Sequence, residues 1–274
     1  MQRDQKKRIL IFVPAYNAER TVQQVVARIP APLAEHETHI LIVDDSSQDG
    51  TFERAHDIST KHSSAFPITV LRNSINQGYG GNQKIGFHFA IQNHFDIVAL
   101  LHGDGQYAPE CLPELLDPLL RNEADAVLGS RMMSRFAALR GGMPLYKYVG
   151  NKILTRFQNR LLKASLSEFH CGYRLYSVEA LRRIPFDRNT SDFHFDTEII
   201  IQLMRAGLRI KELPIPTYYG DEICHVNGIW YAFHVVKATL LSRAQDYGIR
   251  YERKFDMALP TANDPFRRAE ADER

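Results

Sequence analysis

Short apolar runs alternate with helix-like stretches through the first half of the chain. The runs have the length of β-strands, and they span residues 8–13, 39–44, 67–71, 96–101 and 125–129. Between them the pattern predicts helices near residues 18–28, 51–62, 82–94 and 110–121. Alternation of this kind predicts an α/β fold, in which helices cover both faces of a mostly parallel sheet.

Polar, glycine-rich or charged residues follow each of these strands. The segments read "PAYN", "DDSSQDG", "RNSINQGYGGN", "HGDGQ" and "GSRM". In open parallel sheets, ligands bind outside the carboxyl ends of the strands. Five strand ends of this character therefore predict one shared ligand crevice.

The second half of the chain has a different character. Residues 131–167 contain eight Lys or Arg residues and no Asp or Glu. Within them, residues 144–163 predict an amphipathic helix, with its apolar positions on one side and its basic positions on another. Two interpretations remain open: the apolar side packs on the domain, or the helix lies at the surface of an anionic membrane. The apolar positions are Val149, Ile153, Phe157 and Leu161.

Further along, the pattern predicts a helix at 196–207, a strand at 209–215 and a helix at about 228–246. The last stretch, residues 251–274, contains proline and is highly charged, so we expect a disordered tail.

Composition narrows the class of protein. With 274 residues, 44% hydrophobic and 24% charged, the chain is typical of a soluble globular protein. A net charge of +2 gives no reason to propose a nucleic-acid partner. Three widely spaced cysteines without a CxxC pair suit a cytoplasmic protein and argue against a zinc cluster. Since no apolar run approaches the roughly 18 residues that span a bilayer, we expect any membrane contact to be peripheral, at its inner face.

Four motifs in succession carry a family resemblance: "VPAYNAERTV", "ILIVDDSSQDGT", "NQGYGGNQKIGF" and "GDGQ". The chain resembles family-2 glycosyltransferases with the GT-A fold, in particular the branch of dolichol- and polyprenyl-phosphate hexosyltransferases. The resemblance implies a GT-A domain over residues 1–228, with a nucleotide-binding half at 8–130 and an acceptor half at 131–228. A C-terminal helix at 229–250 and the tail would follow.

The resemblance also implies a nucleotide-sugar donor and the residues that bind it. Carboxylates accept hydrogen bonds from ribose hydroxyls or a base N–H, and a tyrosine offers an amphipathic surface. Gly78 and Gly80 would permit close backbone approach, and Lys84 would add positive charge at a helix start. Gln83 stands where a dinucleotide fingerprint needs its third glycine, so a dehydrogenase is excluded. The nucleoside contacts would be Pro14, Ala15, Tyr16, Asn17, Asp44 and Asp45.

The segment "HGDGQ" stands where this fold carries its Asp-x-Asp metal motif. Asp104, which would also contact the donor, and Gln106 offer the hard oxygen ligands that Mn²⁺ or Mg²⁺ bound to a pyrophosphate requires. His102 stands at the position of the first Asp. Two roles remain open for it: it coordinates Mn²⁺, which suits imidazole better than Mg²⁺ does, or it packs beside the site while Asp104 binds the metal.

Catalytic and acceptor-binding residues are expected in the second half. "EFHCGYRLYS" resembles the family's Asp-x-x-Ser-Gly-Phe-Arg element, so Glu168 is a candidate general base or acceptor-orienting group. Asp196, at a helix start, is the first candidate for the base. Arg174 would pair with a phosphate or form a structural salt bridge. Arg131 and the loop residue His225 are further candidates for binding the acceptor or the phosphates.

The implied activity is inverting transfer of a hexose from a UDP- or GDP-linked sugar. The acceptor would be a polyprenyl phosphate or another lipid at a membrane surface, or else a soluble saccharide or other hydroxyl compound. A phosphate acceptor is already an anion and needs no base, whereas a hydroxyl needs one. A non-catalytic sugar-nucleotide-binding module and a sugar-1-phosphate nucleotidyltransferase remain alternatives, although no basic glycine-rich loop follows the first strand. The sequence does not predict the oligomeric state.

Overall fold

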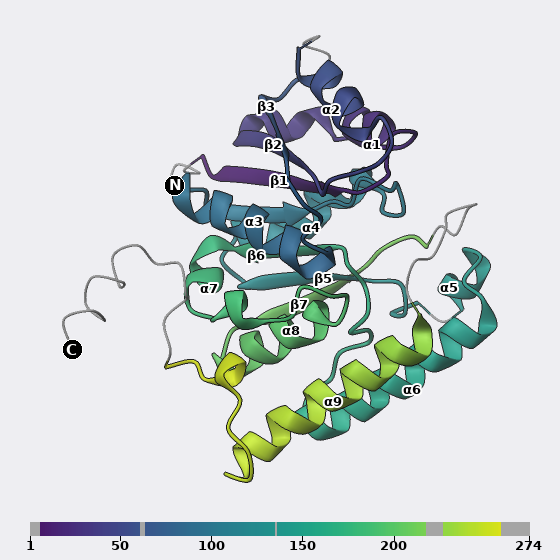
Figure 1. The fold of residues 1–274 in the computed structure, drawn as a ribbon, viewed down its shortest axis with the longest axis vertical. Coiled ribbons are helices and arrows are strands. Elements are labelled where there is room, and N and C mark those ends of the chain that lie inside the picture. The colour runs from purple at the N-terminus through teal and green to yellow at the C-terminus, as the bar shows by residue number, and fades with distance from the viewer. Residues whose placement is uncertain (1–5, 61–63, 135, 218–226, 259–274) are drawn as a thin grey trace, which may run out of the picture.

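The computed structural model describes residues 6–60, 64–134, 136–217 and 227–258 (Figure 1). In this part of the chain, seven strands form one sheet in the order β3-β2-β1-β4-β6-β5-β7. The strands are β1 (Arg8–Ala15), β2 (Glu37–Asp44), β3 (Ile68–Arg72), β4 (Ile97–Leu100), β5 (Ala126–Ser130), β6 (Arg174–Ser177) and β7 (Ile210–Pro214).

Pairing in the sheet is parallel except at β6. β1 pairs in parallel with β2 and β4, β2 with β3, and β5 with β7. β6 is antiparallel to both of its neighbours, β4 and β5. The predicted mostly parallel α/β sheet is therefore confirmed, and the six expected strands are present with ends shifted by one or two residues. β6 was missed because its four residues, "RLYS", lack an apolar run.

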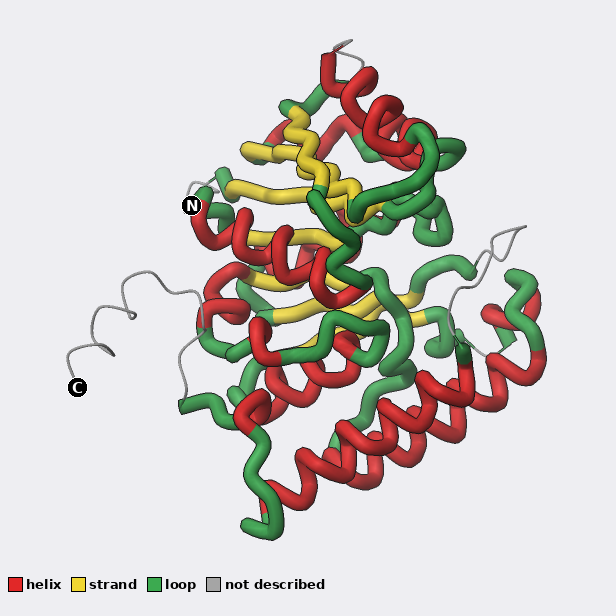
Figure 2. The backbone as a smooth tube through the Cα atoms, viewed as in Figure 1, coloured by secondary structure: helices red, strands yellow, loops and turns green. Residues whose placement is uncertain are grey.

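Helices cover both faces of the sheet (Figure 2). The α-helices are α1 (Val22–Ala27), α2 (Thr51–Thr60), α3 (Tyr79–Gln92), α4 (Leu112–Leu120), α5 (Ala137–Arg140), α6 (Leu145–Leu162), α7 (Val178–Arg182), α8 (Phe195–Arg205) and α9 (Gly228–Asp246). Short 3₁₀ helices are η1 (Ala31–Glu35), η2 (Pro109–Cys111), η3 (Phe186–Arg188) and η4 (Arg253–Phe255).

The core forms two layers because successive strand residues point to opposite faces. Ile9 and Ile11 of β1 join a cluster with α1, α2 and α4. Leu10 and Phe12 join a second cluster with α3, α7 and α8. Both faces of β1 are thus buried, which explains its continuous apolar sequence.

α6 and α9 lie side by side along one edge of the domain (Figure 1). The predicted helix at 144–163 is present, but only the second half of its expected apolar side, at Phe157 and Leu161, is partly buried. Val149 and Ile153 are 45% and 64% exposed, whereas Asn151, Thr155 and Gln158 are buried. Asn151 and Gln158 form hydrogen bonds with Glu168 and Thr197, and these bonds hold the polar side of the helix toward the domain.

The C-terminal helix is followed by packed chain rather than by the start of a disordered tail. Residues 251–258 are described, and Phe255 of η4 is buried. Its carbonyl oxygen accepts hydrogen bonds from Arg205 Nε, at 2.9 Å, and from Gln245 Nε2, at 3.1 Å. The expected start of the tail at 251 is therefore too early, and residues 259–274 lie outside the described part. Among the described helices, none is long and apolar enough to cross a bilayer.

A close contact between α3 and β1 gives a test of this packing. A Cβ at Gly86 would lie 2.2 Å from Cε1 of Phe12, which is fully buried. We expect Gly86→Ala to lower the free energy of unfolding by about 1–3 kcal/mol, because the core has no room for the methyl group. Urea unfolding measures this change.

Gly150→Ala on α6 is the matched control, since nothing lies within 4 Å of the added Cβ. There we expect a gain of up to about 1 kcal/mol, because alanine is the better helix former. Equal effects at the two positions would contradict the packing described here.

Candidate active site

The carboxyl ends of β1, β2 and β4 bring the expected donor-binding segments together. Ala15 pairs with Asp44 in the sheet register. The Asp45 N–H donates to the Ala15 carbonyl at 2.9 Å, and the Gly103 N–H donates to the Pro14 carbonyl at 3.0 Å. The segments "PAYN", "DDSS" and "HGDGQ" therefore meet at the carboxyl ends of these adjacent strands, as expected for a shared crevice.

Asp44 is buried and retains one oxygen without a hydrogen bond. Its Oδ1 accepts from the Ser47 N–H at 3.2 Å and from the Ser47 hydroxyl. Oδ2 lies 3.3 Å from Arg72 Nε but lacks hydrogen-bond geometry to it. A buried acceptor of this kind is normally satisfied, so Oδ2 is suited to a donor group on a ligand.

Asp45 differs from Asp44 in that both of its oxygens accept hydrogen bonds, and the donors lie in the segment that follows β3. Oδ1 accepts from Asn73 Nδ2 at 2.7 Å and from the Gln77 N–H at 2.8 Å. Oδ2 accepts from the Gly78 N–H at 3.0 Å. The side chain is buried. Asp45 therefore holds residues 73–78 beside the end of β2.

The loop after β1 is fixed to the loop after β2. Asn17 has a left-handed backbone, with φ of 50°. Its N–H donates to Ser47 Oγ at 2.9 Å, and its Oδ1 accepts from the Gln48 N–H at 3.1 Å. The neighbouring Tyr16 ring is 46% exposed, which leaves it available for stacking on a base.

The glycines at the start of α3 accommodate the protein's own chain. A Cβ at Gly80 would lie 2.6 Å from the Thr190 carbonyl oxygen, and the Gly80 N–H donates to the Ser191 carbonyl at 2.8 Å. Lys84 Nζ donates to the Asn189 carbonyl. The close approach expected at Gly78 and Gly80 thus involves residues 189–195, and Lys84 is engaged there as well. Phosphate binding by these residues stays a prediction.

Asp104 is the partly exposed carboxylate at the end of β4. Its Oδ1 accepts from the Gln106 N–H at 3.0 Å. Among the described residues, no three His, Cys, Asp or Glu side chains group as a metal cage. A divalent cation often keeps few protein ligands when substrate phosphates supply the others. The donor set around Asp104 fits a cation of that kind rather than a preformed site.

His102 is enclosed between two tyrosine rings. The ring centroid of Tyr79 lies 5.5 Å away, and that of Tyr107 lies 5.4 Å away. Nε2 of His102 is buried without a hydrogen bond, 3.1 Å from the position that a Cβ at Gly172 would take. Only Nδ1 remains as an atom that a cation would contact, and the packing role is the one with direct structural support.

Asp196 lies in the first turn of α8, surrounded by donors. The Tyr79 hydroxyl donates to Oδ2 at 2.8 Å, and Gln83 Nε2 donates to Oδ1 at 3.4 Å. Arg174 NH2 lies 3.3 Å from Oδ2. Burial, together with the Asp196 charge, raises the pKa of Tyr79 well above its usual range, so this phenol stays a donor. Tyr79 stands inside the motif "NQGYGGNQKIGF", but neither the motif nor periodicity predicts that its side chain reaches α8.

Glu168 is fully buried and paired with Arg131. Its oxygens accept from the Arg131 N–H at 2.8 Å, from Arg131 Nε at 3.1 Å and from Asn151 Nδ2 at 2.8 Å. Burial alone would raise the pKa of this carboxyl, but the charge and hydrogen bonds of Arg131 outweigh burial, and the pKa is lowered. Glu168 and Arg131 thus form one buried ion pair that positions the chain around residues 168–170.

Arg174 donates from all three guanidinium nitrogens to backbone carbonyls. Nε donates to Cys171 at 2.7 Å, NH1 to Asp196 at 2.7 Å and NH2 to Phe169 at 2.8 Å. Its side chain is fully buried. Of the two open roles for Arg174, this geometry favours the structural salt bridge.

His170 is a residue of the site that sequence reasoning missed. Its Nδ1 lies 2.9 Å from the hydroxyl oxygen of Tyr231, on α9. Burial lowers the pKa of His170 to about 4, so the ring is neutral at physiological pH. The motif "EFHCG" identifies the segment, but it does not predict the contact with Tyr231, which lies 61 residues further along the chain. His225 lies outside the described residues.

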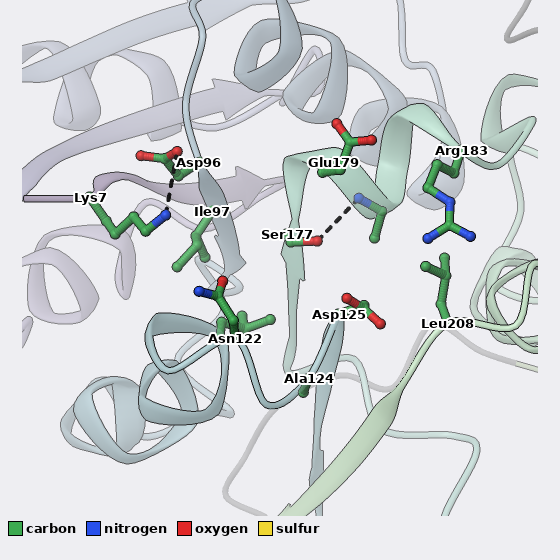
Figure 3. A pocket seen from close by; sticks show the side chains of 12 residues that line it. Lys7, Asp96, Ile97, Asn122, Ala124, Asp125, Ser177, Glu179, Arg183 and Leu208 are labelled. Atoms are coloured by element: carbon green, nitrogen blue, oxygen red, sulfur yellow. Dashed lines mark hydrogen bonds and ion pairs between the residues drawn. The ribbon is translucent and has the colours of Figure 1, made fainter. Parts of the chain in front are cut away.

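A separate hollow lies at the opposite, amino ends of the parallel strands (Figure 3). Lys7, Asp96 and Asp125 contribute to its lining, and Lys7 Nζ lies 4.0 Å from Asp96 Oδ1. These residues precede β1, β4 and β5. The hollow is thus at the amino ends of the parallel strands, away from the segments that carry the expected chemistry.

Comparison with known proteins places this geometry in context. The profile described as "Glycosyl transferase family 2" matches residues 10–185. An uncharacterized protein of Methanocaldococcus jannaschii is 30% identical over 79% of this chain and 84% of its own length. The undecaprenyl-phosphate mannosyltransferase of Micrococcus luteus is 28% identical over 76% of this chain and 82% of its own length.

Solved structures show the same fold. The crystal structure of glucosyl-3-phosphoglycerate synthase from Mycobacterium tuberculosis, in complex with Mn²⁺ and UDP-glucose, aligns with a TM-score of 0.64 and 21% identity. The alignment covers 90% of this chain and 81% of that one. The expected glycosyltransferase fold is confirmed.

The buried ion pair predicts a pH-dependent stability. Glu168→Gln leaves the Arg131 charge without its partner, so we expect the free energy of unfolding at pH 7 to fall by about 3–5 kcal/mol. Since the folded-state pKa of Glu168 is depressed, its contribution is present above the unfolded-state pKa and is lost as pH falls through the folded-state pKa. The difference between wild type and variant should therefore shrink below about pH 4.

Urea unfolding at pH 7 and below pH 4 measures both effects. Glu179→Gln, at an exposed position of α7, is the control and should change little at either pH. A Glu168→Gln protein as stable as the wild type at pH 7 would refute the structural role of the pair.

Proposed function

This chain belongs to glycosyl transferase family 2, and from that premise we propose that it transfers a hexose from a UDP- or GDP-linked sugar to a polyprenyl phosphate at a membrane surface. The reaction would proceed with inversion at the anomeric carbon. The observation that carries the proposal is the state of the two candidate bases. Asp196 and Glu168 are both buried and both paired within the protein.

The donor would lie across the carboxyl ends of β1, β2 and β4. Asp44 Oδ2, the buried oxygen without a hydrogen bond, would accept from the nucleoside. The exposed Tyr16 ring would stack on the base. Asn17 and Asp45 would support this geometry by fixing the two loops on either side.

Asp104 would hold a divalent cation at the pyrophosphate, with Gln106 as the second oxygen ligand and His102 packed beside them. Mn²⁺ and Mg²⁺ both suit oxygen ligands of this kind, and the aligned synthase was solved with Mn²⁺. When bound, the cation stabilises the negative charge that develops on the leaving nucleoside diphosphate.

A phosphate acceptor fits the state of the two carboxylates. An oxygen of the acceptor phosphate would form the new bond to the anomeric carbon as the bond to the nucleoside diphosphate breaks. Because that oxygen is already anionic, no protein group must remove a proton. The similar Micrococcus luteus protein is named for an undecaprenyl phosphate. A hydroxyl acceptor would instead require Asp196 or Glu168 to leave its present partners.

The proposal predicts a lipid-linked product and a dependence on Asp104. With UDP- and GDP-hexoses as radiolabelled donors, we expect label to enter an organic-extractable polyprenyl-phosphate fraction, and EDTA to abolish it. Asp104→Ala should reduce this transfer by about 100-fold or more, since it removes the cation's carboxylate.

Glu114→Gln, at an exposed position of α4, is the control and should retain activity. Transfer that persists in EDTA would contradict metal dependence. Label found only on water-soluble hydroxyl acceptors would contradict the lipid-phosphate assignment.

Asp196→Asn separates a phosphate acceptor from a hydroxyl acceptor. If Asp196 is a positioning residue, transfer to polyprenyl phosphate should stay within about tenfold of wild type. Removal of a general base costs about 10²–10⁴-fold. Turnover at saturating substrate measures the difference, and thermal unfolding of the same preparation checks that the fold is intact. A loss beyond 100-fold in a folded variant would identify Asp196 as the base.

A further inference from the structure

Exposed apolar side chains concentrate on α6 and α9. Of the large hydrophobic residues that are exposed in the described chain, half belong to these two helices. We call their outer surface the α6–α9 face. It comprises Leu145, Tyr146, Val149 and Ile153 of α6, with Ile229, Trp230, Phe233 and Leu240 of α9. Because α6 and α9 are in contact, these exposed apolar side chains lie on two adjoining helices, and a concentration of this kind marks an interaction site.

Hydrogen bonds on the inner side fix α6 in this orientation. Asn151 Nδ2 donates to Glu168 at 2.8 Å, and Gln158 Nε2 lies 3.5 Å from Thr197 Oγ1 on α8. Rotating the helix to bury Ile153 would leave these polar groups without partners, which is costly in a buried site. The outward position of the apolar side is therefore a property of the fold.

α9 is anchored in the same manner, with aromatic rings outside. Tyr231 bonds to His170 on the inner side. On the outer side, the Trp230 and Phe233 rings stack with centroids 5.5 Å apart, and both are more than half exposed. The amphipathic Trp230 ring favours the boundary between lipid head groups and acyl chains, and the apolar Phe233 ring adds hydrophobic area beside it.

The charge of the two helices distinguishes between two kinds of partner for this face: a second copy of this chain and a lipid bilayer. α6 carries Lys152, Arg156 and Arg160 at exposed positions, and α9 carries Lys237. Residues 131–167 and 228–245 contain no Asp or Glu. A second copy of the same face would bring cations against cations, whereas anionic lipid attracts each of them. We propose that the α6–α9 face docks the enzyme on an anionic lipid bilayer, with its apolar side chains in the head-group region.

The face also lies next to the acceptor half of the site. Asn151 of α6 bonds to Glu168, and Tyr231 of α9 bonds to His170, so both docking helices contact the segment 168–170 directly. Docking would place this segment near the lipid phosphates. Only this last step rests on the proposed function, since bilayer binding itself requires no particular acceptor.

Vesicle flotation of the full chain tests the proposal. Wild type should float with vesicles that contain phosphatidylglycerol, should bind phosphatidylcholine vesicles much less, and should be released as salt rises. The double variant Ile153→Glu/Ile229→Glu should bind at least tenfold more weakly, because it places two charges in the apolar face. Ile75→Glu is the matched control for binding: Ile75 is 66% exposed, Ile153 is 64% exposed, and Ile75 follows β3 at the far edge of the sheet.

A charge variant tests the electrostatic part. Lys152→Gln/Arg156→Gln should weaken binding by about fivefold per residue and flatten the salt dependence. No co-flotation of the wild type with anionic vesicles would overturn the proposal. So would an equal loss in Ile75→Glu, or self-association in solution that the Ile153→Glu/Ile229→Glu variant abolishes while vesicle binding is absent.

Transfer to a short-chain, water-soluble prenyl phosphate separates this inference from the proposed function. The Ile153→Glu/Ile229→Glu variant should retain that activity while it loses vesicle binding, which supports docking as a distinct property. Vesicle binding by a wild type that transfers no sugar to any prenyl phosphate would support docking and refute the acceptor. Loss of soluble transfer in the variant, with its fold intact, would show that the face belongs to the site and would overturn the docking role.

Discussion

The buried guanidinium of Arg174 is the constraint on which the centre of the molecule depends. An unpaired buried charge is too costly to persist, and this one is compensated by three backbone carbonyls and the Asp196 carboxylate. Those acceptors come from the segment before β6 and from the first turn of α8. One side chain thus joins the antiparallel strand in the middle of the sheet to the helix that carries Asp196, and that carboxylate is oriented by the same contact.

Much of the fold could be predicted because it follows from periodicity. β1 alternates between two cores, and α9 begins and ends as its apolar spacing indicates. The failures share a cause: contacts between distant residues. β6 is a strand because β4 and β5 pair with it on both sides. α6 has its polar side inward because Asn151 has Glu168 as a partner. In the candidate site, the sequence identified Asp44, Asp45 and Asp196 as residues but not their partners, such as Tyr79, which decide what each carboxylate is available to do.

The candidate site combines a rigid half, around residues 168–174, with a more open half at the ends of β2 and β4. Around residues 168–174 and 196, the charged side chains Glu168, Arg174 and Asp196 are engaged in pairs within the protein. At the ends of β2 and β4, Asp44 Oδ2 has no hydrogen bond and Asp104 is partly exposed. Unsatisfied acceptors at the open half are suited to hydrogen bonds from a ligand, whereas the paired charges of the other half hold their own segments in place.

The polar inner side of α6 has a mechanical consequence. Apolar packing tolerates a modest rotation of a helix about its own axis, because dispersion contacts are non-directional. Hydrogen bonds through Asn151 and Gln158 depend on angle, so they set the azimuth of the helix as well as its position. A force applied to the outer surface of α6 would therefore act as a torque on Glu168 and on α8 rather than dissipate by slippage, which makes this helix a lever between the surface of the domain and its centre.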